Sequence, residues 1–170
     1  IFLKAGDRLI MEFYYAPFSC AYAAHVLLED AEAKYTSKRV DLKKGDQRSP
    51  EFLKVNPKGR VPALITERGI LTETPSILVY ICQTHPEKNL APTDPYEFAE
   101  AQAFNMYLSS TVHVGHSHKH RGHRWTDDEH ALASLTSRVK DNMTDYAEFI
   151  EENYIKGPWV LGENYSMCDP

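Results

Sequence analysis

The first part of the chain has a run of apolar residues, followed by a segment in which apolar positions recur at helical spacing. Residues 9–15 form a mostly apolar run that is typical of a buried strand and is ended by Ala16-Pro17. In residues 20–33 the apolar positions recur every three or four residues, which predicts a helix. Ser19 stands directly before this segment and is a favourable N-cap residue. The chain is therefore predicted to open with a strand followed by a helix.

The pattern up to residue 85 predicts three more strands and two more helices. The strands are expected at 35–42, 61–66 and 70–72. A short helix opens at Ser49-Pro50-Glu51, and another is expected at 75–85. The order of elements is β-α-β-α-β-β-α. Right-handed crossovers place the first three strands in one sheet, and a hairpin adds the fourth.

Beyond residue 85 only helical spacing remains. Residues 86–95 contain three prolines and little periodicity, so we interpret them as a linker. Apolar positions then recur at three- or four-residue spacing in 98–112 and 132–150, which predicts long helices. A segment with strands followed by one with helices alone favours two domains. We expect an α/β domain at 11–85 and an all-helical domain at 96–170.

Both ends of the chain carry unusual signals. Met11 is followed at once by the predicted strand, so we interpret residues 1–10 as an extension. The last residues include Ser166 and, three positions later, Asp169, a pair that is typical of a helix start. We therefore expect the helical domain to be incomplete at its C-terminal end.

Composition narrows the class of protein. Of 170 residues, 42% are hydrophobic and 25% charged, as in ordinary globular proteins, and the formal net charge is −5. This negative charge argues against nucleic acid as the main partner, and no apolar run approaches the roughly 20 residues that a membrane helix needs. Cys20, Cys82 and Cys168 are widely separated and form no C-x-x-C pair. A reducing cytoplasm is the simplest location.

Cys20 is the first candidate for chemistry. It stands in the predicted first turn of a helix, where the helix dipole and free N–H groups favour a reactive thiolate. The alternative is a buried cysteine that acts as a small hydrophobic residue. The hydroxyl of Ser19 could donate a hydrogen bond to a bound thiolate or serve only as the N-cap.

A second candidate site combines a turn, a strand and a helix start. The turn Asn56-Pro57-Lys58-Gly59 precedes a strand opened by Val61-Pro62, whose edge would offer unpaired backbone groups to an extended peptide. Thr74 is predicted as the N-cap of the next helix, with Pro75 as its first residue. That helix start suits a carboxylate. Glu73 and Thr74 would otherwise be a solvated residue and an ordinary cap. Together these features predict a small, acidic, peptide-like ligand.

Histidines gather in the second half of the chain, namely His113, His116, His118, His120 and His123. Two of them, His116 and His120, are four residues apart and would share one helix face. Between Val112 and Trp125 no Cys, Asp or Glu completes a metal-ligand set, and neighbouring Lys and Arg residues add repulsive charge. We interpret the cluster as a basic helix end with one histidine facing a cleft, and expect no metal. A metal-binding protein remains the competing hypothesis.

Four blocks, in this order and spacing, resemble the cytosolic glutathione S-transferases, and the bacterial beta class most closely. They are residues 14–20, 56–64, 71–74 and 112–113, and the segment 166–169 is similar to a buried capping box of that family. The resemblance runs from about Met11 to the end of the chain. It implies a thioredoxin-like N-terminal domain, an all-helical C-terminal domain and a cytoplasmic homodimer that acts in bacterial detoxification.

The resemblance also implies how glutathione, the co-substrate, would bind. Val61 would pair through its backbone with the cysteinyl part, before a cis peptide bond to Pro62. Glu73 would hold the amine of the γ-glutamyl end. Thr74 would hold its carboxylate, although Gly or Ser is commoner at this position. Lys44, or the lysine before it, would approach the glycine carboxylate.

Three residues take catalytic roles in this resemblance. Cys20, next to Ser19, would lie near the glutathione sulfur, and His113 of the helical domain would face it. Phe18 departs from the family pattern, which has Gly at this position. The two tyrosines that end the first strand leave open a mechanism in which a tyrosine hydroxyl activates the thiol.

The predicted function is that of a glutathione transferase. The activated thiol would attack a small electrophile or exchange with a disulfide substrate, without a nucleic acid or membrane partner. The alternative is a non-catalytic module of the same fold that binds glutathione or a protein partner. Cys20, Ser19 and His113 together favour the enzyme, because a pure scaffold has no physical need for them.

Overall fold

Residues 10–170 are described by the computed structural model, and they form two compact units. Unit 1 reaches Ala91, and unit 2 spans Pro92–Asp169. The division lies inside segment 86–95, which the sequence suggested as a linker. The domain bounds themselves stay predictions. Of the predicted extension 1–10, all but Ile10 lies outside the described residues.

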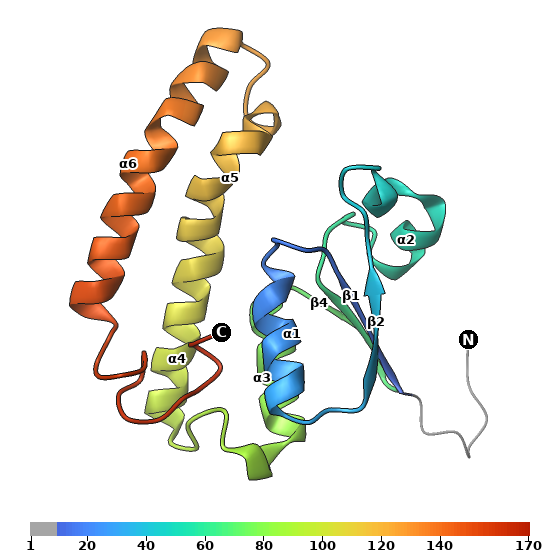
Figure 1. The fold of residues 1–170 in the computed structure, drawn as a ribbon, viewed down its shortest axis with the longest axis vertical. Helices are drawn as coiled ribbons and strands as arrows, with labels where there is room; N and C mark the ends of the chain where they lie inside the picture. Colours follow the sequence, from blue (N-terminus) through green and yellow to red (C-terminus); the bar gives the residue numbers. More distant parts are fainter. Residues whose placement is uncertain (1–9) are drawn as a thin grey trace. The chain divides into compact units, whose positions relative to one another are not determined.

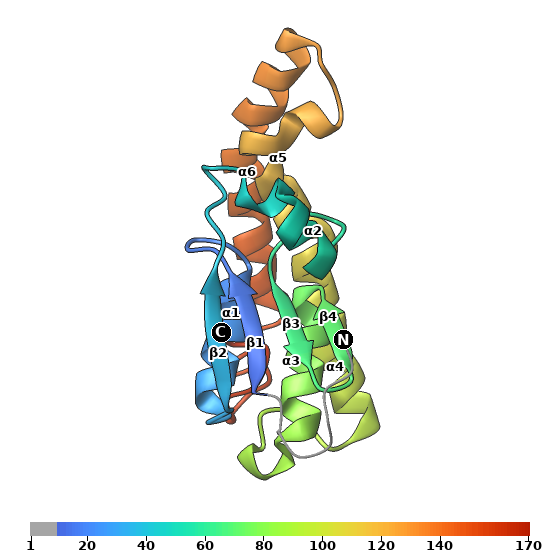
Figure 2. The same ribbon diagram turned by 90° about the vertical axis from the view of Figure 1, so that its right-hand side faces the viewer.

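Unit 1 contains a four-stranded sheet in the order β2-β1-β3-β4 (Figures 1 and 2). The strands are β1 (Met11–Tyr15), β2 (Tyr35–Arg39), β3 (Ala63–Thr66) and β4 (Gly69–Thr72). β1 pairs with β2 in parallel, whereas the β1–β3 and β3–β4 pairs are antiparallel. With its helices this sheet is thioredoxin-like, so the predicted fold class is confirmed.

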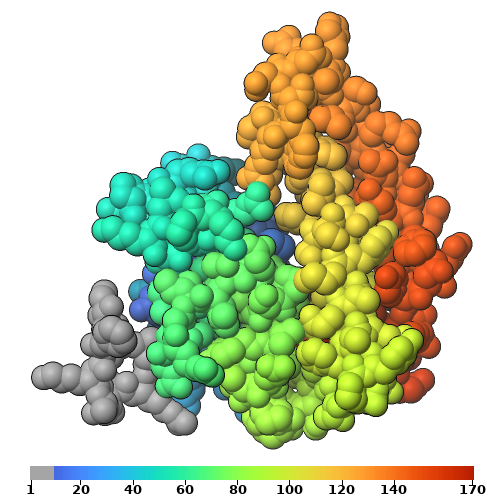
Figure 3. Space-filling model, turned by 180° about the vertical axis from the view of Figure 1, so that it is seen from behind, coloured from blue at the N-terminus to red at the C-terminus, as the bar shows by residue number. Residues whose placement is uncertain are grey.

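The helices of unit 1 lie on both sides of the sheet. α1 (Ala21–Asp30) and α3 (Thr74–Thr84) lie side by side on one face (Figures 1 and 2). α2 (Pro50–Val55) lies on the opposite side, after the short 3₁₀ helix η1 (Asp46–Arg48). A further 3₁₀ helix, η2 (Pro86–Lys88), follows α3. The segments from α2 to α3 form one continuous outer surface in Figure 3, turquoise to green.

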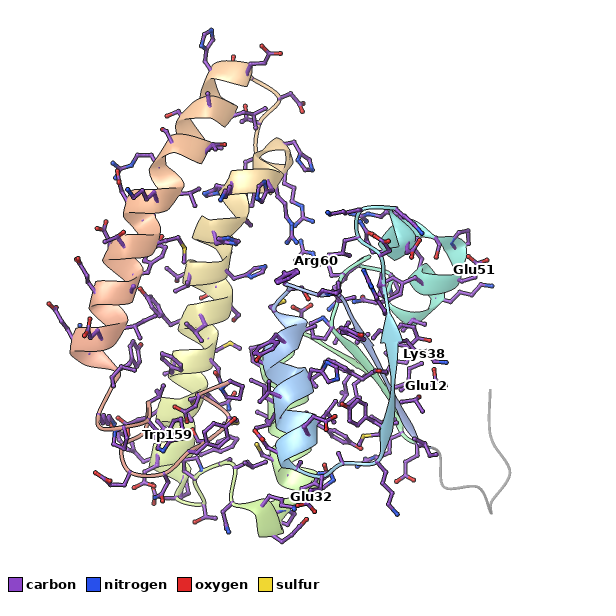
Figure 4. The ribbon with its side chains drawn as sticks, in the orientation of Figure 1. Glu12, Glu32, Lys38, Glu51, Arg60 and Trp159 are labelled. Carbon is purple, nitrogen blue, oxygen red and sulfur yellow. The ribbon has the colours of Figure 1, made fainter. Side chains whose placement is uncertain are left out.

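The core of unit 1 lies between the sheet and the pair α1 and α3. Phe13 of β1 and Leu64 of β3 are paired across the sheet and fully buried, and the buried positions on the helices recur with helical spacing. On the opposite face of the sheet, Glu12 and Lys38 point away from α1 (Figure 4). The buried set is Phe13, Leu27, Leu28, Leu64, Ile77 and Ile81. Burying one such side chain contributes about 1.5–3 kcal/mol, so this core holds both helices against the sheet.

Two elements end earlier than the sequence predicts. α1 stops at Asp30 because Glu32 adopts a φ of 51°, in the left-handed region that terminates helices. β2 stops at Arg39, since the Asp41 carboxylate accepts two following backbone N–H groups and starts a turn. Both terminations depend on local hydrogen bonding or backbone conformation, which the apolar pattern does not report.

Unit 2 is built of helices. They are α4 (Pro95–Tyr107), the π-helix η3 (Leu108–Val112), α5 (His113–Arg121), the 3₁₀ helix η4 (Gly122–Arg124) and α6 (Glu129–Asn153). α6 packs against α5 (Figure 1). The all-helical second part agrees with the prediction, and the structure adds the π-turn in its first long helix. No helix among residues 10–170 has the length and apolar composition that crossing a membrane requires.

The Ser166–Asp169 segment forms the capping pair expected from the sequence. The Ser166 N–H and hydroxyl both donate to Asp169 Oδ2, at 2.7 and 3.1 Å. The Cys168 N–H donates in turn to Ser166 Oγ at 3.2 Å. Ser166 is buried, so these bonds satisfy polar groups that water does not reach.

Candidate functional site

Cys20 is exposed at the start of α1, and it is the N-cap, where Ser19 was predicted. The shift arises because Ser19 O accepts from the Tyr22 N–H at 3.0 Å, in a tight turn before regular α-helical bonding begins. Ser19 Oγ donates to Ala16 O at 2.7 Å and accepts from the Ala21 N–H at 3.3 Å. Because its proton is engaged with a carbonyl, donation to a bound thiolate would require rotation of the hydroxyl.

Val61 lies next to Cys20 in space. The Cys20 thiol donates to Val61 O at 3.7 Å, across 41 residues of sequence. The Val61–Pro62 peptide bond is cis, as the family resemblance implied. Within residues 10–170 the Val61 N–H has no acceptor. β3 begins only at Ala63, because Pro62 has no N–H to give to a sheet. The predicted strand edge at Val61 is thus a bend ahead of β3.

Thr74 is not the N-cap of α3, contrary to the prediction. Glu73 is the N-cap residue, since its carbonyl accepts the Ile77 N–H at 3.1 Å, and Thr74 is the first residue of the helix. Pro75 is consequently the second helical residue. The Thr74 hydroxyl donates to Cys20 O at 3.3 Å. The structure therefore brings Cys20, Val61 and Thr74 together.

Glu73 has a partner that the sequence reasoning missed. Its carboxylate is hydrogen-bonded to Lys58 Nζ, which also donates to Thr72 Oγ1 at 2.7 Å. Glu73 itself has a φ of 71°, a left-handed conformation that is unusual for a residue with a long side chain. Lys58 stands inside the block 56–64 that carries the family resemblance. Its contact with Glu73, 15 residues later, leaves no periodic pattern in the sequence.

The turn before Val61 is fixed by a buried side chain. Asn56 is 1% exposed, its Nδ2 donates to Arg60 O at 2.6 Å, and its Oδ1 accepts from the Lys58 N–H at 3.1 Å. Gly59 has a φ of 62°, and a Cβ there would lie 3.0 Å from Gln47 O. A rigid turn of this kind sets where the Lys58 side chain starts.

Lys44 lies in an exposed turn of unit 1. The N–H groups of Lys44 and Lys43 donate to Asp41 Oδ1 at 3.3 and 3.0 Å, and these bonds, that of Lys44 foremost, hold the pKa of the Asp41 carboxyl below its usual range. Among the described residues no hydrogen bond joins the Lys44 side chain to Cys20, Val61 or Glu73. The structure does not bring it into the cluster of the other candidates.

His113 is the first residue of α5 and belongs to unit 2, whereas the other candidates belong to unit 1. It is half-buried and directly follows the π-helix. The preceding serines Ser109 and Ser110 both donate to Met106 O, at 3.1 and 2.7 Å. π-turns inside α-helices occur frequently at functional positions. The run of small hydroxyl residues is the sequence signal for this irregularity.

The remaining histidines show no clustering of ligand groups. Nowhere in the described part of the chain do three His, Cys, Asp or Glu side chains come together in a way that could hold a metal ion. The His118 ring lies edge-on to Trp125, with 4.5 Å between ring centroids. The segment ends in exposed basic residues, so it resembles a solvated helix end.

Tyr14 bears on the tyrosine-based alternative. Its hydroxyl donates to Glu12 Oε2 at 3.4 Å, and burial together with the Glu12 charge raises its pKa. A phenol with a raised pKa keeps its proton at neutral pH, so it serves as a donor rather than a base. Its hydrogen bond is directed to Glu12 on the same strand and not to Cys20.

Phe18 is a feature of the site that the sequence marked only as a departure. It adopts a φ of 58° and its side chain is fully exposed two residues before Cys20. A left-handed conformation costs a bulky residue about 1–3 kcal/mol and is concentrated at functional sites. The usual Gly at this position would adopt it without strain.

Comparisons with known proteins agree on one family. Residues 11–83 match the model of the glutathione S-transferase N-terminal domain. A glutathione transferase homologue from Sulfitobacter, solved with bound glutathione, is 40% identical with a TM-score of 0.92, over 95% of this chain and 78% of that chain. Glutathione S-transferase GstA of Escherichia coli O157:H7 is 26% identical over 94% of this chain and 77% of its own length.

A third relative is named for redox chemistry. The disulfide-bond oxidoreductase YfcG of Escherichia coli K12 is 25% identical over 94% of this chain and 76% of its own length. Proteins similar to this chain include both beta-class and zeta-class enzymes. The comparisons therefore identify the family and not the class.

Proposed function

The chain belongs to the glutathione S-transferase family, and on this premise we propose that it binds glutathione on unit 1 and uses its thiol as a nucleophile. The thiolate would attack the electrophilic carbon of a small substrate, forming a thioether while the leaving group departs. With a disulfide substrate it would instead take part in thiol–disulfide exchange through Cys20. The family relatives include both kinds of activity.

One observation carries this proposal, the convergence of three backbone segments at the start of α1. Cys20 Sγ lies 3.7 Å from Val61 O, and Thr74 Oγ1 lies 3.3 Å from Cys20 O. A tripeptide whose cysteinyl backbone pairs with Val61 would thus have its sulfur near the N-terminus of α1. The partial positive charge of a helix N-terminus stabilises a thiolate there.

The two ends of glutathione would extend along unit 1 from this point. The γ-glutamyl end would reach Glu73 with its ammonium group and the first turn of α3 at Thr74 with its carboxylate. Pro62 would keep the Val61 N–H directed to the ligand. At the other end, the exposed Lys44 would approach the glycine carboxylate. The Sulfitobacter homologue, which was solved with glutathione, supports this ligand.

We assign the finer identity on the same basis. Cys20 with His113 supports a beta-class enzyme, in which His113 would act on the glutathione sulfur from the helical unit. A homodimer in a bacterial cytoplasm, acting in detoxification, is the setting that the family resemblance suggests. Within the described residues, Cys20, Cys82 and Cys168 form no disulfide.

Calorimetric titration with glutathione tests ligand binding, and conjugation of 1-chloro-2,4-dinitrobenzene tests transfer. We expect saturable heat and a rate of conjugate formation above the uncatalysed reaction. Disulfide reduction with glutathione, measured on the same preparation, separates redox exchange from transfer. Saturable binding without either reaction would favour the non-catalytic module, and no binding would rule out the proposal.

The role of Cys20 is tested with glutathione disulfide and intact-mass measurement. The Cys20 thiolate attacks one sulfur of the disulfide, releases one glutathione thiolate, and keeps the other half as a mixed disulfide. Cys20→Ala should therefore lose the glutathionyl adduct, whereas the control Cys168→Ala, at a buried cysteine, should keep it. An adduct that persists in Cys20→Ala would show that this role is misassigned.

The role of His113 is tested by separating binding from turnover. His113→Ala should lower kcat for conjugation by roughly 10²-fold or more if the imidazole transfers a proton to or from the reacting thiol. Glutathione binding measured by calorimetry should remain nearly unchanged. Equal kcat in the two proteins would make His113 a residue without a catalytic role.

A further inference from the structure

The ion pair of Lys58 and Glu73 is half exposed, and this determines what it can do. The side chains are 47% and 57% exposed, so the pair contributes little to folding stability. Lys58 is also fixed at its base, since buried Asn56 holds its N–H in the turn before Val61. A cation placed at the start of α3 by a rigid turn, yet not needed for folding, is available for a ligand.

Among residues 10–170, the hydrogen bonds of the pair leave capacity unused on both side chains. An ammonium group has three donors, and Lys58 uses one for Thr72 Oγ1 and one for Glu73 Oε1. Glu73 uses Oε1 for this contact, which leaves Oε2 as an acceptor. One free donor and one free acceptor, on adjacent side chains, complement a carbon atom that carries both an ammonium group and a carboxylate.

The charge of the pair matters at the start of α3. The free N–H groups there attract a carboxylate, but the carboxylate of Glu73, the N-cap residue, would repel it. Pro75 removes one of the N–H groups. Lys58 cancels the negative charge of Glu73 and supplies a further donor. Without Lys58, the site would accept the ammonium group of a ligand and disfavour its carboxylate.

We propose that Lys58 and Glu73 together recognise the zwitterionic amino-acid head of the γ-glutamyl group, with Lys58 binding its α-carboxylate and Glu73 its ammonium. This inference rests on the proposed binding of glutathione. It makes Lys58 a specificity-determining residue: peptides that carry both charged groups on one carbon are preferred over those that lack the carboxylate.

The test compares Lys58→Met with Lys54→Met, a matched control at an exposed lysine in the last turn of α2. Each protein is titrated by calorimetry with glutathione and with γ-aminobutyryl-cysteinyl-glycine, which keeps the amine and lacks the α-carboxylate. Lys58→Met should bind glutathione about two- to fivefold more weakly, the range for an exposed charge pair. Its affinity for the decarboxylated peptide should equal or exceed that of the wild type.

Other outcomes separate the two proposals. Equal weakening for both peptides, unchanged binding of glutathione, or tighter binding of glutathione by Lys58→Met would overturn the inference; the last would show that Lys58 competes with the ligand for Glu73. In each of these cases the wild type still binds glutathione, so the proposed function stands. A wild type without heat of binding would overturn both. Thermal melting of Lys58→Met should match that of Lys54→Met.

Discussion

The three cysteines differ in their expected reactivity because their surroundings differ. Cys20 is exposed at a helix start, whereas Cys82 and Cys168 are buried within their units. The Cys168 thiol donates to Ala101 O at 3.6 Å, and burial raises its pKa to about 11. The sequence marked Cys20 as the reactive candidate from its position. It gave no basis for judging Cys168, whose environment depends on contacts with α4.

We expect a single rapidly reacting thiol in the native protein. At pH 8 a group with a pKa of about 11 is ionised in only about one molecule in a thousand. Titration with a chromogenic disulfide reagent at this pH should give one fast equivalent, from Cys20. Three equivalents should appear after unfolding in guanidinium chloride. A fast equivalent that survives in Cys20→Ser would contradict the assignment.

We also expect ionisation of the Cys168 thiol to lower the free energy of unfolding at alkaline pH. Its pKa is raised from 9.0 to about 11 in the folded state, so folding favours the protonated thiol. The contribution is complete below pH 9 and is lost as pH rises from 9 to 11, by about 2–3 kcal/mol. Burial and the hydrogen bond to Glu29 also raise the pKa of Tyr35, which adds to the same trend.

Urea denaturation at a series of pH values isolates this contribution. Between pH 9 and 11, the free energy of unfolding should fall less steeply in Cys168→Ala than in the wild type, because Tyr35 is common to both. The variant is expected to be less stable at pH 7 through loss of packing, so the slopes and not the absolute values are compared. Parallel slopes would exclude ionisation of Cys168 as a cause.

Among the helices, the starts differ in how well the local sequence predicts their N-cap. Ser49, predicted from the Ser-Pro-Glu signal, accepts from the Phe52 N–H at 3.1 Å. Thr74-Pro75 carries a similar signal and behaves differently, since its hydroxyl bonds to Cys20 O instead. The difference lies in tertiary contact: α1 brings a carbonyl within reach of Thr74. A local pattern cannot report a partner that is 54 residues away.

A capping comparison follows from this difference. Asp94, the N-cap of α4, accepts from two N–H groups of the first turn at 2.9 and 3.0 Å. Asp94→Ala should lower the free energy of unfolding by about 1 kcal/mol, as loss of a cap does. Thr74→Val, which removes a hydroxyl that caps nothing, should cost less than half as much. Chemical denaturation measures both, and a larger loss for Thr74→Val would contradict the observed cap.

In the whole molecule, the apolar pattern predicts the order of elements, whereas the thioredoxin-like fold class depended on the family resemblance. Strand and helix periods are properties of neighbouring residues, so the β-α-β-α-β-β-α order and the helical second part followed from them. The same distinction, between neighbouring residues and tertiary contacts, applies to the candidate site. Cys20 and Val61 were recognisable from local blocks, whereas the Lys58–Glu73 pair depends on a turn meeting a helix start. The left-handed Phe18 likewise has no periodic signature.

The homodimer proposed from the family resemblance can be tested in solution. The described residues expose several large apolar side chains, among them Tyr22, Tyr96, Met106 and Phe149. Single exposed apolar side chains are ordinary on a protein surface, so they do not by themselves indicate a dimer. On the family resemblance we expect sedimentation equilibrium to give twice the chain mass of 19.4 kDa. A mass of one chain at micromolar concentration would contradict the homodimer.

The π-helix Leu108–Val112 sets the direction in which the side chains after it point. A π-turn holds one residue more than the α-helical turn it replaces, and one residue corresponds to about 100° around the helix axis. Every side chain from His113 onward is turned by that angle relative to an uninterrupted α-helix. Removing one serine from the turn would leave the imidazole of His113 chemically unchanged and rotate its direction by about 100° around the helix axis.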